Sequence, residues 1–143
     1  MTKAVIDSNV LIAMIDSRDA LHEKAERLLD QMTVQDAEIL YFDCVLNETL
    51  SVLGRRLEEK KRAHEFSALV DLMQTVVPET MIIWASADSQ RLYPKIVALM
   101  RQTSGRLNFH DALIALKCQE LEIKSLLSFD ADFDALTWIN RLS

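Results

Sequence analysis

The sequence contains few of the residues that form tight turns and glycine-rich loops. Its 143 residues include only two glycines and two prolines, and Gly54 and Gly105 lie far apart. A phosphate-binding loop or a dinucleotide-binding fingerprint needs several glycines close together, so the sequence excludes both. The scarcity of glycine and proline favours long helices over tight hairpins.

Cysteine and histidine are equally scarce. The two cysteines, Cys44 and Cys118, form no C-x-x-C pair, and the three histidines form no H-E-x-x-H motif, which excludes the usual zinc sites. Two isolated cysteines make no disulfide framework, and reduced thiols are typical of a cytoplasmic protein. The apolar run near the N-terminus, Ala-Val-Ile, is too short for a signal peptide, and no stretch approaches a membrane span. We therefore expect a cytoplasmic protein with no membrane partner.

Basic residues are outnumbered by acidic ones. Lysine and arginine total 16 against 22 aspartates and glutamates, which gives a net charge of −6. This excess of negative charge does not indicate the positive surface that is typical of nucleic-acid-binding proteins. An acidic protein can still bind a nucleic acid where metal ions supply positive charge locally. The one basic cluster, at residues 55–62, also contains two glutamates and is interpreted as a solvated helix end.

The pattern of apolar residues predicts alternating strands and helices. Half of the residues are hydrophobic, and the length fits one domain over residues 1–143. Short apolar runs predict strands at 3–7, 39–42, 81–84, 125–127 and 137–139. Helical spacing predicts helices at 10–15, 19–32, 43–59, 62–76, 86–103 and 111–122, with Pro94 breaking or kinking the fifth. Strands separated by helices indicate an α/β fold with a parallel sheet flanked by helices on both faces.

Four carboxylates fall at equivalent places relative to these strands. Asp7 directly follows the first strand, and Glu48 lies just over one turn into the helix after the second. Asp111 opens the most apolar helix, and Asp130 lies just past the fourth strand. All four positions belong to the carboxyl edge of a parallel sheet, where loops diverge and ligands bind.

Each acid also has a purely structural interpretation. Asp7 can form an Asx turn, and Asp130 can cap the short helix that follows it. Asp111 can cap its own helix together with Asn108. Glu48 lies opposite the leucine seam of its helix, as a solvent-facing glutamate does. Isolated surface acids are not expected to select one sheet edge four times, so we favour a cluster.

Clustered carboxylates are suited to binding a metal ion. Like charges a few ångströms apart raise each other's pKa, and they stay ionised together only if a cation neutralises them. Oxygen ligands without histidine or thiolate select Mg²⁺ or Mn²⁺ over zinc. Such an ion binds phosphate oxygens and lowers the pKa of a bound water, so the chemistry that fits best is phosphodiester hydrolysis.

Four stretches of the sequence resemble the motifs of PIN-domain ribonucleases, and most of all the small VapC-type toxins of prokaryotic toxin–antitoxin pairs. These stretches are Val5-Ile6-Asp7-Ser8-Asn9-Val10-Leu11, Asn47-Glu48, Asp111-Ala112-Leu113-Ile114-Ala115 and Leu127-Ser128-Phe129-Asp130-Ala131-Asp132-Phe133. The first and last are the most specific. Together with the strand–helix order, the resemblance covers nearly the whole chain. Ser8 and Ser128 stand where threonine is common in the family, a departure that keeps the hydroxyl group.

The resemblance implies a parallel sheet of strand order 3-2-1-4-5 and a metal site at its carboxyl edge. The residues that it assigns as catalytic and metal-binding are Asp7, Glu48, Asp111 and Asp130. Asn9 and Ser128 match polar residues that orient the carboxylates in the family, and Asp132 either joins them or replaces Asp130 as a ligand. The implied activity is Mg²⁺- or Mn²⁺-dependent endonucleolytic hydrolysis of single-stranded RNA. The implied partners are RNA, a cognate antitoxin and a second copy in a homodimer.

Two other functions remain open. A phosphatase of the haloacid dehalogenase type also has an aspartate after its first strand, but it uses a second aspartate two residues later as an acid and base. This sequence has Asn9 there, which cannot exchange protons. The second alternative is a catalytically inactive PIN fold that binds RNA or protein, because an intact site does not prove turnover. If the protein binds RNA, as a ribonuclease or as an inactive module, Arg55, Lys60 and Arg106 are candidates for contacts with the phosphates.

Overall fold

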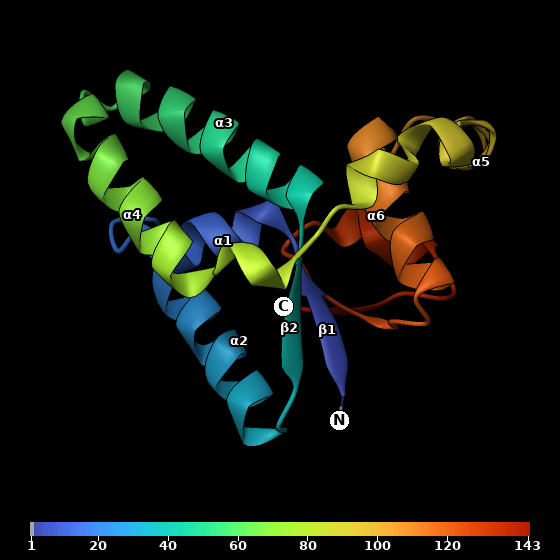
Figure 1. Ribbon diagram of the computed structural model, residues 1–143, viewed down its shortest axis with the longest axis horizontal. Coiled ribbons are helices and arrows are strands. Elements are labelled where there is room, and N and C mark those ends of the chain that lie inside the picture. The colour runs from blue at the N-terminus through green and yellow to red at the C-terminus, as the bar shows by residue number, and fades with distance from the viewer. Residues whose placement is uncertain (1) are drawn as a thin grey trace.

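Five short parallel strands form one sheet at the centre of the computed structural model, which describes residues 2–143 (Figure 1). The strands are β1 (Lys3–Ile6), β2 (Glu38–Phe42), β3 (Ile82–Ile83), β4 (Ser125–Leu127) and β5 (Asn140–Leu142). Their order across the sheet is β3-β2-β1-β4-β5, and every neighbouring pair is parallel. The predicted α/β class and the strand order 3-2-1-4-5 are therefore confirmed.

Helices connect the strands and cover both faces of the sheet. The α-helices are α1 (Ser8–Ile15), α2 (His22–Val34), α3 (Asp43–Glu59), α4 (Phe66–Val76), α5 (Ser89–Gln102) and α6 (Phe109–Glu120). Short 3₁₀ helices are η1 (Ala63–Glu65), η2 (Glu79–Met81), η3 (Ala85–Asp88) and η4 (Ala131–Ala135). Helices α1 to α4 lie on one side of β1 and β2, whereas α5 and α6 pack against each other on the other side (Figure 1). None of the helices among residues 2–143 is both long enough and apolar enough to span a bilayer.

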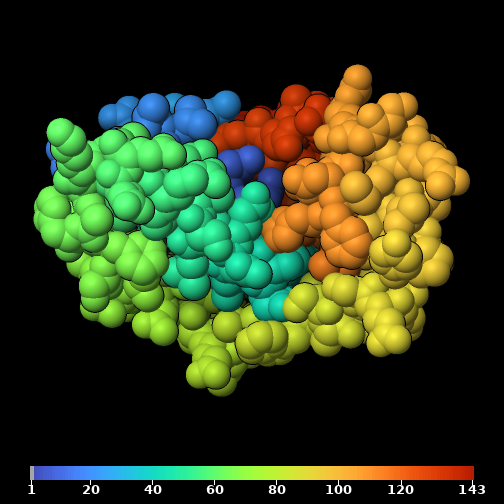
Figure 2. All heavy atoms as spheres, turned by 90° about the horizontal axis from the view of Figure 1, so that it is seen from above, coloured from blue at the N-terminus to red at the C-terminus, as the bar shows by residue number. Residues whose placement is uncertain are grey.

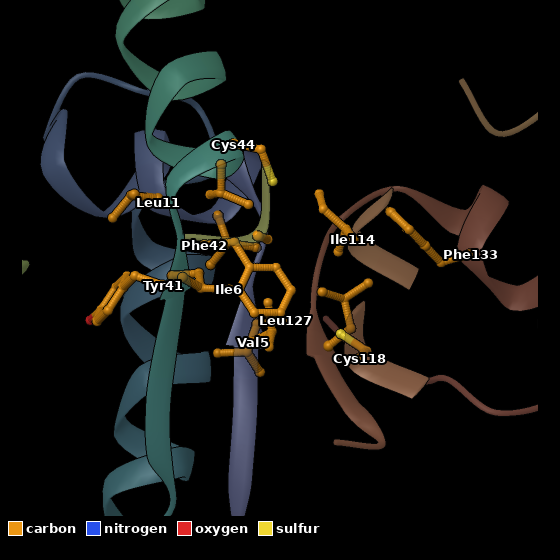
Figure 3. Close-up of a cluster of buried hydrophobic side chains, with 14 of the residues drawn as sticks. Val5, Ile6, Leu11, Tyr41, Phe42, Cys44, Ile114, Cys118, Leu127 and Phe133 are labelled. Atoms are coloured by element: carbon orange, nitrogen blue, oxygen red, sulfur yellow. The ribbon is translucent and has the colours of Figure 1, made fainter. Parts of the chain in front are cut away.

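The central strands are continuous apolar runs because both of their faces are buried in the core. Val5 and Ile6 of β1 are fully buried, because helices cover both of their faces. Figure 3 shows Phe42 on the side of the sheet that faces Ile114 of α6, with Leu11 of α1 on the opposite side. Helix α6 is apolar on nearly all sides; it packs against α5, and its Ile114 faces the sheet (Figure 3). Both cysteines are buried and unpaired.

The last strand begins later than its sequence predicts. The strand expected at 137–139 is formed instead by Asn140–Leu142, with Ser125 opposite Asn140. Trp138 Nε1 donates to the Ala115 carbonyl at 3.0 Å, so the preceding residues pack against α6 rather than extending the sheet. Apolar character alone could not distinguish these two forms of burial.

Helix α5 continues through Pro94, although the sequence predicts a break or kink there. Pro94 lies in the first half of the helix, on its exposed face. The hydrogen bond that proline removes is therefore lost on the solvent side, where water can replace it. Leu92, Ile96 and Leu99 are buried against the protein and hold the helix in place across the proline.

Candidate active site

The four predicted carboxylates lie in one cleft at the carboxyl edge of the sheet. The cleft has a volume of about 220 Å³. Its lining residues are Asp7, Ser8, Asn9, Ile12, Glu48, Val52, Arg56, Asn108, Asp111 and Asp130. Figure 2 looks onto this edge and shows a hollow with blue N-terminal residues at its floor, between green α3 and the orange start of α6. Larger hollows, of about 370 and 560 Å³, lie beside Trp138 and contain at most one carboxylate each.

Asp7 is the most buried of the four acids. It directly follows β1 and caps α1, with Oδ1 accepting from the Ser8 amide at 2.8 Å. Oδ2 accepts from the Ser128 hydroxyl at 2.6 Å. Only 4% of Asp7 is exposed, and this burial raises the pKa of its carboxyl although both hydrogen bonds oppose the shift. The Asx-type cap expected from the sequence and the place in the cleft are therefore both present.

Asn9 and Ser128 connect the ends of β1 and β4 around Asp7. The amide nitrogen of Asn9 lies 3.5 Å from both Asp7 Oδ2 and Ser128 Oγ. Its oxygen accepts from the Phe129 amide at 3.1 Å. Ser128, which is fully buried, accepts from the Asp130 amide at 3.1 Å while donating to Asp7. Both residues thus contact the acids that the sequence expects them to orient.

Asp111 lies at the start of α6 and closes a capping box with Asn108. Its amide donates to Asn108 Oδ1 at 2.8 Å, and its carboxylate accepts from the Asn108 amide at 3.5 Å. Burial and then the charge of Asp7 raise the pKa of Asp111 to about 7, with smaller contributions from Asp130 and Glu48. Asp111 is therefore close enough to the other three acids to experience their charge.

Glu48 reaches the cleft from the second turn of α3 and contacts His110 of α6. His110 Nδ1 lies 3.0 Å from Glu48 Oε2, an ion-pair contact without good hydrogen-bond alignment. His110 Nε2 lies 2.6 Å from the Cys44 carbonyl. The contact with His110 lowers the pKa of Glu48 against the effect of burial. Burial alone would lower the pKa of His110, but its contacts with Cys44 and Glu48 outweigh this and raise it to about 11.

Asp130 lines the cleft, whereas Asp132 does not. Asp130 caps η4, and its Oδ1 accepts from the Asp132 amide at 2.9 Å. The side chain of Asp132 is 47% exposed and lies 3.9 Å from Arg106 Nε. The structure therefore places Asp130 with the other acids and turns Asp132 toward Arg106.

Two residues of the cleft region were not predicted from the sequence. Arg56 lines the cleft, whereas the predicted phosphate contacts Arg55, Lys60 and Arg106 do not. Glu48 and Arg56 are eight residues apart on α3, so they share a helix face. This spacing is the feature of the sequence that could have indicated Arg56 as a cleft residue. The contact between His110 and Glu48 joins two helices that are distant in the sequence, and no local pattern could indicate it.

The oxygen-rich donor set suits Mg²⁺ or Mn²⁺ by its chemistry. Carboxylates of Asp7, Glu48, Asp111 and Asp130 face one cleft, and burial together with the charges of the other three raises the pKa of Asp111. Within residues 2–143, no three histidine, cysteine, aspartate or glutamate side chains already converge closely enough to hold a metal ion. The acids thus share the cleft without being gathered on one point.

Comparisons with known proteins agree with this architecture. A family model described as the PIN domain matches residues 4–139. VapC20 of Mycobacterium tuberculosis, a sarcin-ricin loop cleaving toxin, has 22% identity and a TM-score of 0.68, covering 92% of this chain and 93% of that one. VapBC2 of Rickettsia felis, solved with a DNA fragment from its promoter, has 14% identity and a TM-score of 0.69, covering 99% and 100%. No curated protein matches the sequence. The structural likeness shows the fold, and because the family model spans nearly the whole sequence, this chain belongs to the PIN domain family.

Proposed function

We propose that the protein is a divalent-metal-dependent endoribonuclease that hydrolyses phosphodiester bonds of single-stranded RNA. The observation that supports this most strongly is the meeting of four carboxylates in one cleft. They are contributed by the end of β1, by α3, by α6 and by the loop after β4. Burial and the charges of the neighbouring acids together raise the pKa of Asp111, and a cation in the cleft would offset both.

In this proposal Asp7 and Asp111 would hold the principal Mg²⁺ or Mn²⁺, and Glu48 and Asp130 would complete the site or bind a second ion. Such an ion, when bound, would lower the pKa of a water and offset negative charge on the attacked phosphate. Ser128 and the Ser8 amide keep both oxygens of Asp7 in fixed directions. Asn9, which contacts Asp7, Ser128 and the Phe129 amide, maintains the spacing between the two strand ends.

Arg56 is the residue best placed to contact the RNA backbone. It lines the same cleft, two helical turns from Glu48, and its side chain is 47% exposed. An arginine can donate two parallel hydrogen bonds to a phosphate. Single-stranded RNA is favoured as substrate because in-line attack on phosphorus needs a flexible backbone.

The structural neighbours suggest a biological setting. One is a sarcin-ricin loop cleaving toxin, and the other is VapBC2 bound to a DNA fragment from its promoter. By this likeness we propose that the protein is the toxin of a toxin–antitoxin pair, acts in the cytoplasm, and forms a homodimer. A short neighbouring gene whose product binds this chain and suppresses its cleavage of RNA would support this role.

The phosphatase alternative is less well supported. Its mechanism needs a second carboxyl group two residues after the first, and here Asn9 has its side chain committed to Asp7, Ser128 and Phe129. An inactive RNA- or protein-binding module has the same residues and is distinguished only by assay.

The test is a cleavage assay on a structured RNA with single-stranded loops, in Mg²⁺, Mn²⁺ and EDTA. Wild type should cleave with either metal and stop in EDTA. Asp7→Asn should lose cleavage while retaining its circular dichroism spectrum. Activity that survives chelation would contradict the metal requirement, and no cleavage by wild type under any condition would favour the binding module.

A further inference from the structure

Three of the four cleft acids are fixed by backbone amides, and Glu48 is not. Asp7 accepts from the Ser8 amide, and Asp111 accepts from the Asn108 amide. Asp130 accepts from the Asp132 amide. Glu48 lies just past the first turn of α3, so the backbone amides around it are taken up by hydrogen bonds within the helix. It is also the longest of the four side chains, so it has the most rotamer freedom to lose.

His110 of α6 contacts the Glu48 carboxylate and could hold its side chain in place. It is the second residue of α6, its side chain is 27% exposed, and it contacts α3 at two successive turns. Nε2 lies 2.6 Å from the Cys44 carbonyl, and Nδ1 lies 3.0 Å from Glu48 Oε2. A carbonyl and a carboxylate only accept hydrogen bonds, so both ring nitrogens face acceptors. The ring is held against the backbone of α3 on one side and against Glu48 on the other.

We propose that His110 is a positioning residue that holds the Glu48 carboxylate in the cleft. The inference rests on the proposed metal-dependent function, because Glu48 matters there as a metal-binding group. His110 itself does not line the cleft. It couples the start of α6, where Asp111 lies, to the turn of α3 that presents Glu48. Without His110, the Glu48 carboxylate loses its 3.0 Å contact with the ring, and of the two side chains that lower its pKa only that of Ser8 is left.

A merely structural role for His110 makes a different prediction. If the ring only joined α6 to α3, its loss would lower the melting temperature whether or not residue 48 were acidic. A positioning role requires that the effect pass through Glu48. The two roles are separated by a double-mutant cycle, which detects whether two residues act together.

The experiment measures Mn²⁺ affinity by calorimetry and RNA cleavage for wild type, His110→Ala, Glu48→Ala and the double variant. His110→Ala should weaken Mn²⁺ binding by about 10-fold to 100-fold, the range found for residues that orient metal ligands. In the Glu48→Ala background, His110→Ala should cause no further loss. His110→Gln keeps one donor and should recover part of the affinity, and it serves as the second variant if His110→Ala does not fold. His64→Ala, at an exposed histidine of η1, is the matched control and should bind as wild type does.

Two outcomes overturn the inference while leaving the proposed function intact. One is a His110→Ala protein that binds Mn²⁺ as tightly as wild type, and the other is a set of losses that add in the double variant. If wild type neither binds Mn²⁺ nor cleaves RNA, the proposed function fails and the inference fails with it.

Discussion

The hydroxyl of Ser128 donates a 2.6 Å hydrogen bond to Asp7, across 121 residues of sequence. Both residues are buried, at the ends of the neighbouring strands β4 and β1. The same hydroxyl oxygen accepts from the Asp130 amide. One side chain therefore fixes the positions of two cleft acids relative to each other.

Replacing Ser128 by alanine should leave Asp7 buried without this donor. We expect the free energy of unfolding to fall by about 1–3 kcal/mol, the cost of an unsatisfied buried acceptor. The pKa of Asp7, already raised by burial, should rise further, and Mn²⁺ binding should weaken. Urea denaturation at pH 7 measures the first effect. Ser128→Thr keeps the hydroxyl and is the control, so equal destabilisation by both variants would contradict the assignment.

The pKa of Asp111 predicts how pH affects the metal-free protein. Its folded value of about 7 exceeds its ordinary value of 3.8, so between these values the folded state binds more protons than the unfolded state. Stability from this group is present at low pH and is lost as pH rises from about 4 through 7. Asp111→Asn should therefore stabilise the metal-free protein at pH 8, on the order of 1–2 kcal/mol once screening by the open cleft is included.

Metal should reverse this trend. Because protons and cations compete for the same carboxylates, Mn²⁺ should raise the melting temperature more at pH 8 than at pH 6. Melting curves of wild type and Asp111→Asn, with and without Mn²⁺, check both statements. An equal Mn²⁺ effect at the two pH values would show that Asp111 does not titrate with the metal site.

Arg56→Ala should impair RNA cleavage without impairing metal binding. Loss of a phosphate contact is expected to lower kcat/KM by about 3–10-fold, chiefly through KM. Arg55→Ala is the matched control, because Arg55 is the neighbouring arginine on α3 and does not line the cleft. Equal losses in the two variants would assign the effect to general charge rather than to the cleft.

A buried ion pair outside the cleft should be sensitive to the loss of either partner. Arg62 donates to both oxygens of Asp16, at 2.9 and 3.2 Å, and both residues are buried. Arg62→Ala leaves Asp16 uncompensated and should cost about 3–5 kcal/mol in urea denaturation. Arg18→Ala, which removes an exposed contact with Glu65, should cost less than about 1 kcal/mol.

The same pair gives a pH prediction of the opposite sign to that of Asp111. Burial alone would raise the pKa of Asp16, but the hydrogen bonds from Arg62 outweigh it and lower the pKa below 3.8. Stability from this group is present above pH 3.8 and is lost as pH falls further. The loss of unfolding free energy in Arg62→Ala, relative to wild type, should therefore be largest near neutral pH and shrink as pH falls below 3.8. Urea denaturation at pH 7 and pH 3 measures this, and an equal loss at the two pH values would contradict the account.

The sequence predicts the parallel sheet and the shared edge of the four acids, because both follow from local pattern. Apolar runs and helical spacing specify elements, and each acid lies next to the end of an element. The contact between His110 and Glu48 depends on how α6 packs against α3, and the start of β5 depends on Trp138 bonding to α6. Tertiary packing decides both, so a pattern that extends over a few residues cannot predict them. The place of Arg56 in the cleft is only partly predictable from the sequence. Its spacing from Glu48 is helical, but this spacing does not distinguish Arg56 from Arg55.

The chain order of the cleft residues also matters while the protein is being synthesised. Asp7 leaves the ribosome long before Ser128 and Asp130, which complete its surroundings. A nascent chain therefore has an incomplete cleft until Asp130 has emerged. In the proposed ribonuclease, this order would delay cleavage of the message and the ribosome that are producing the chain.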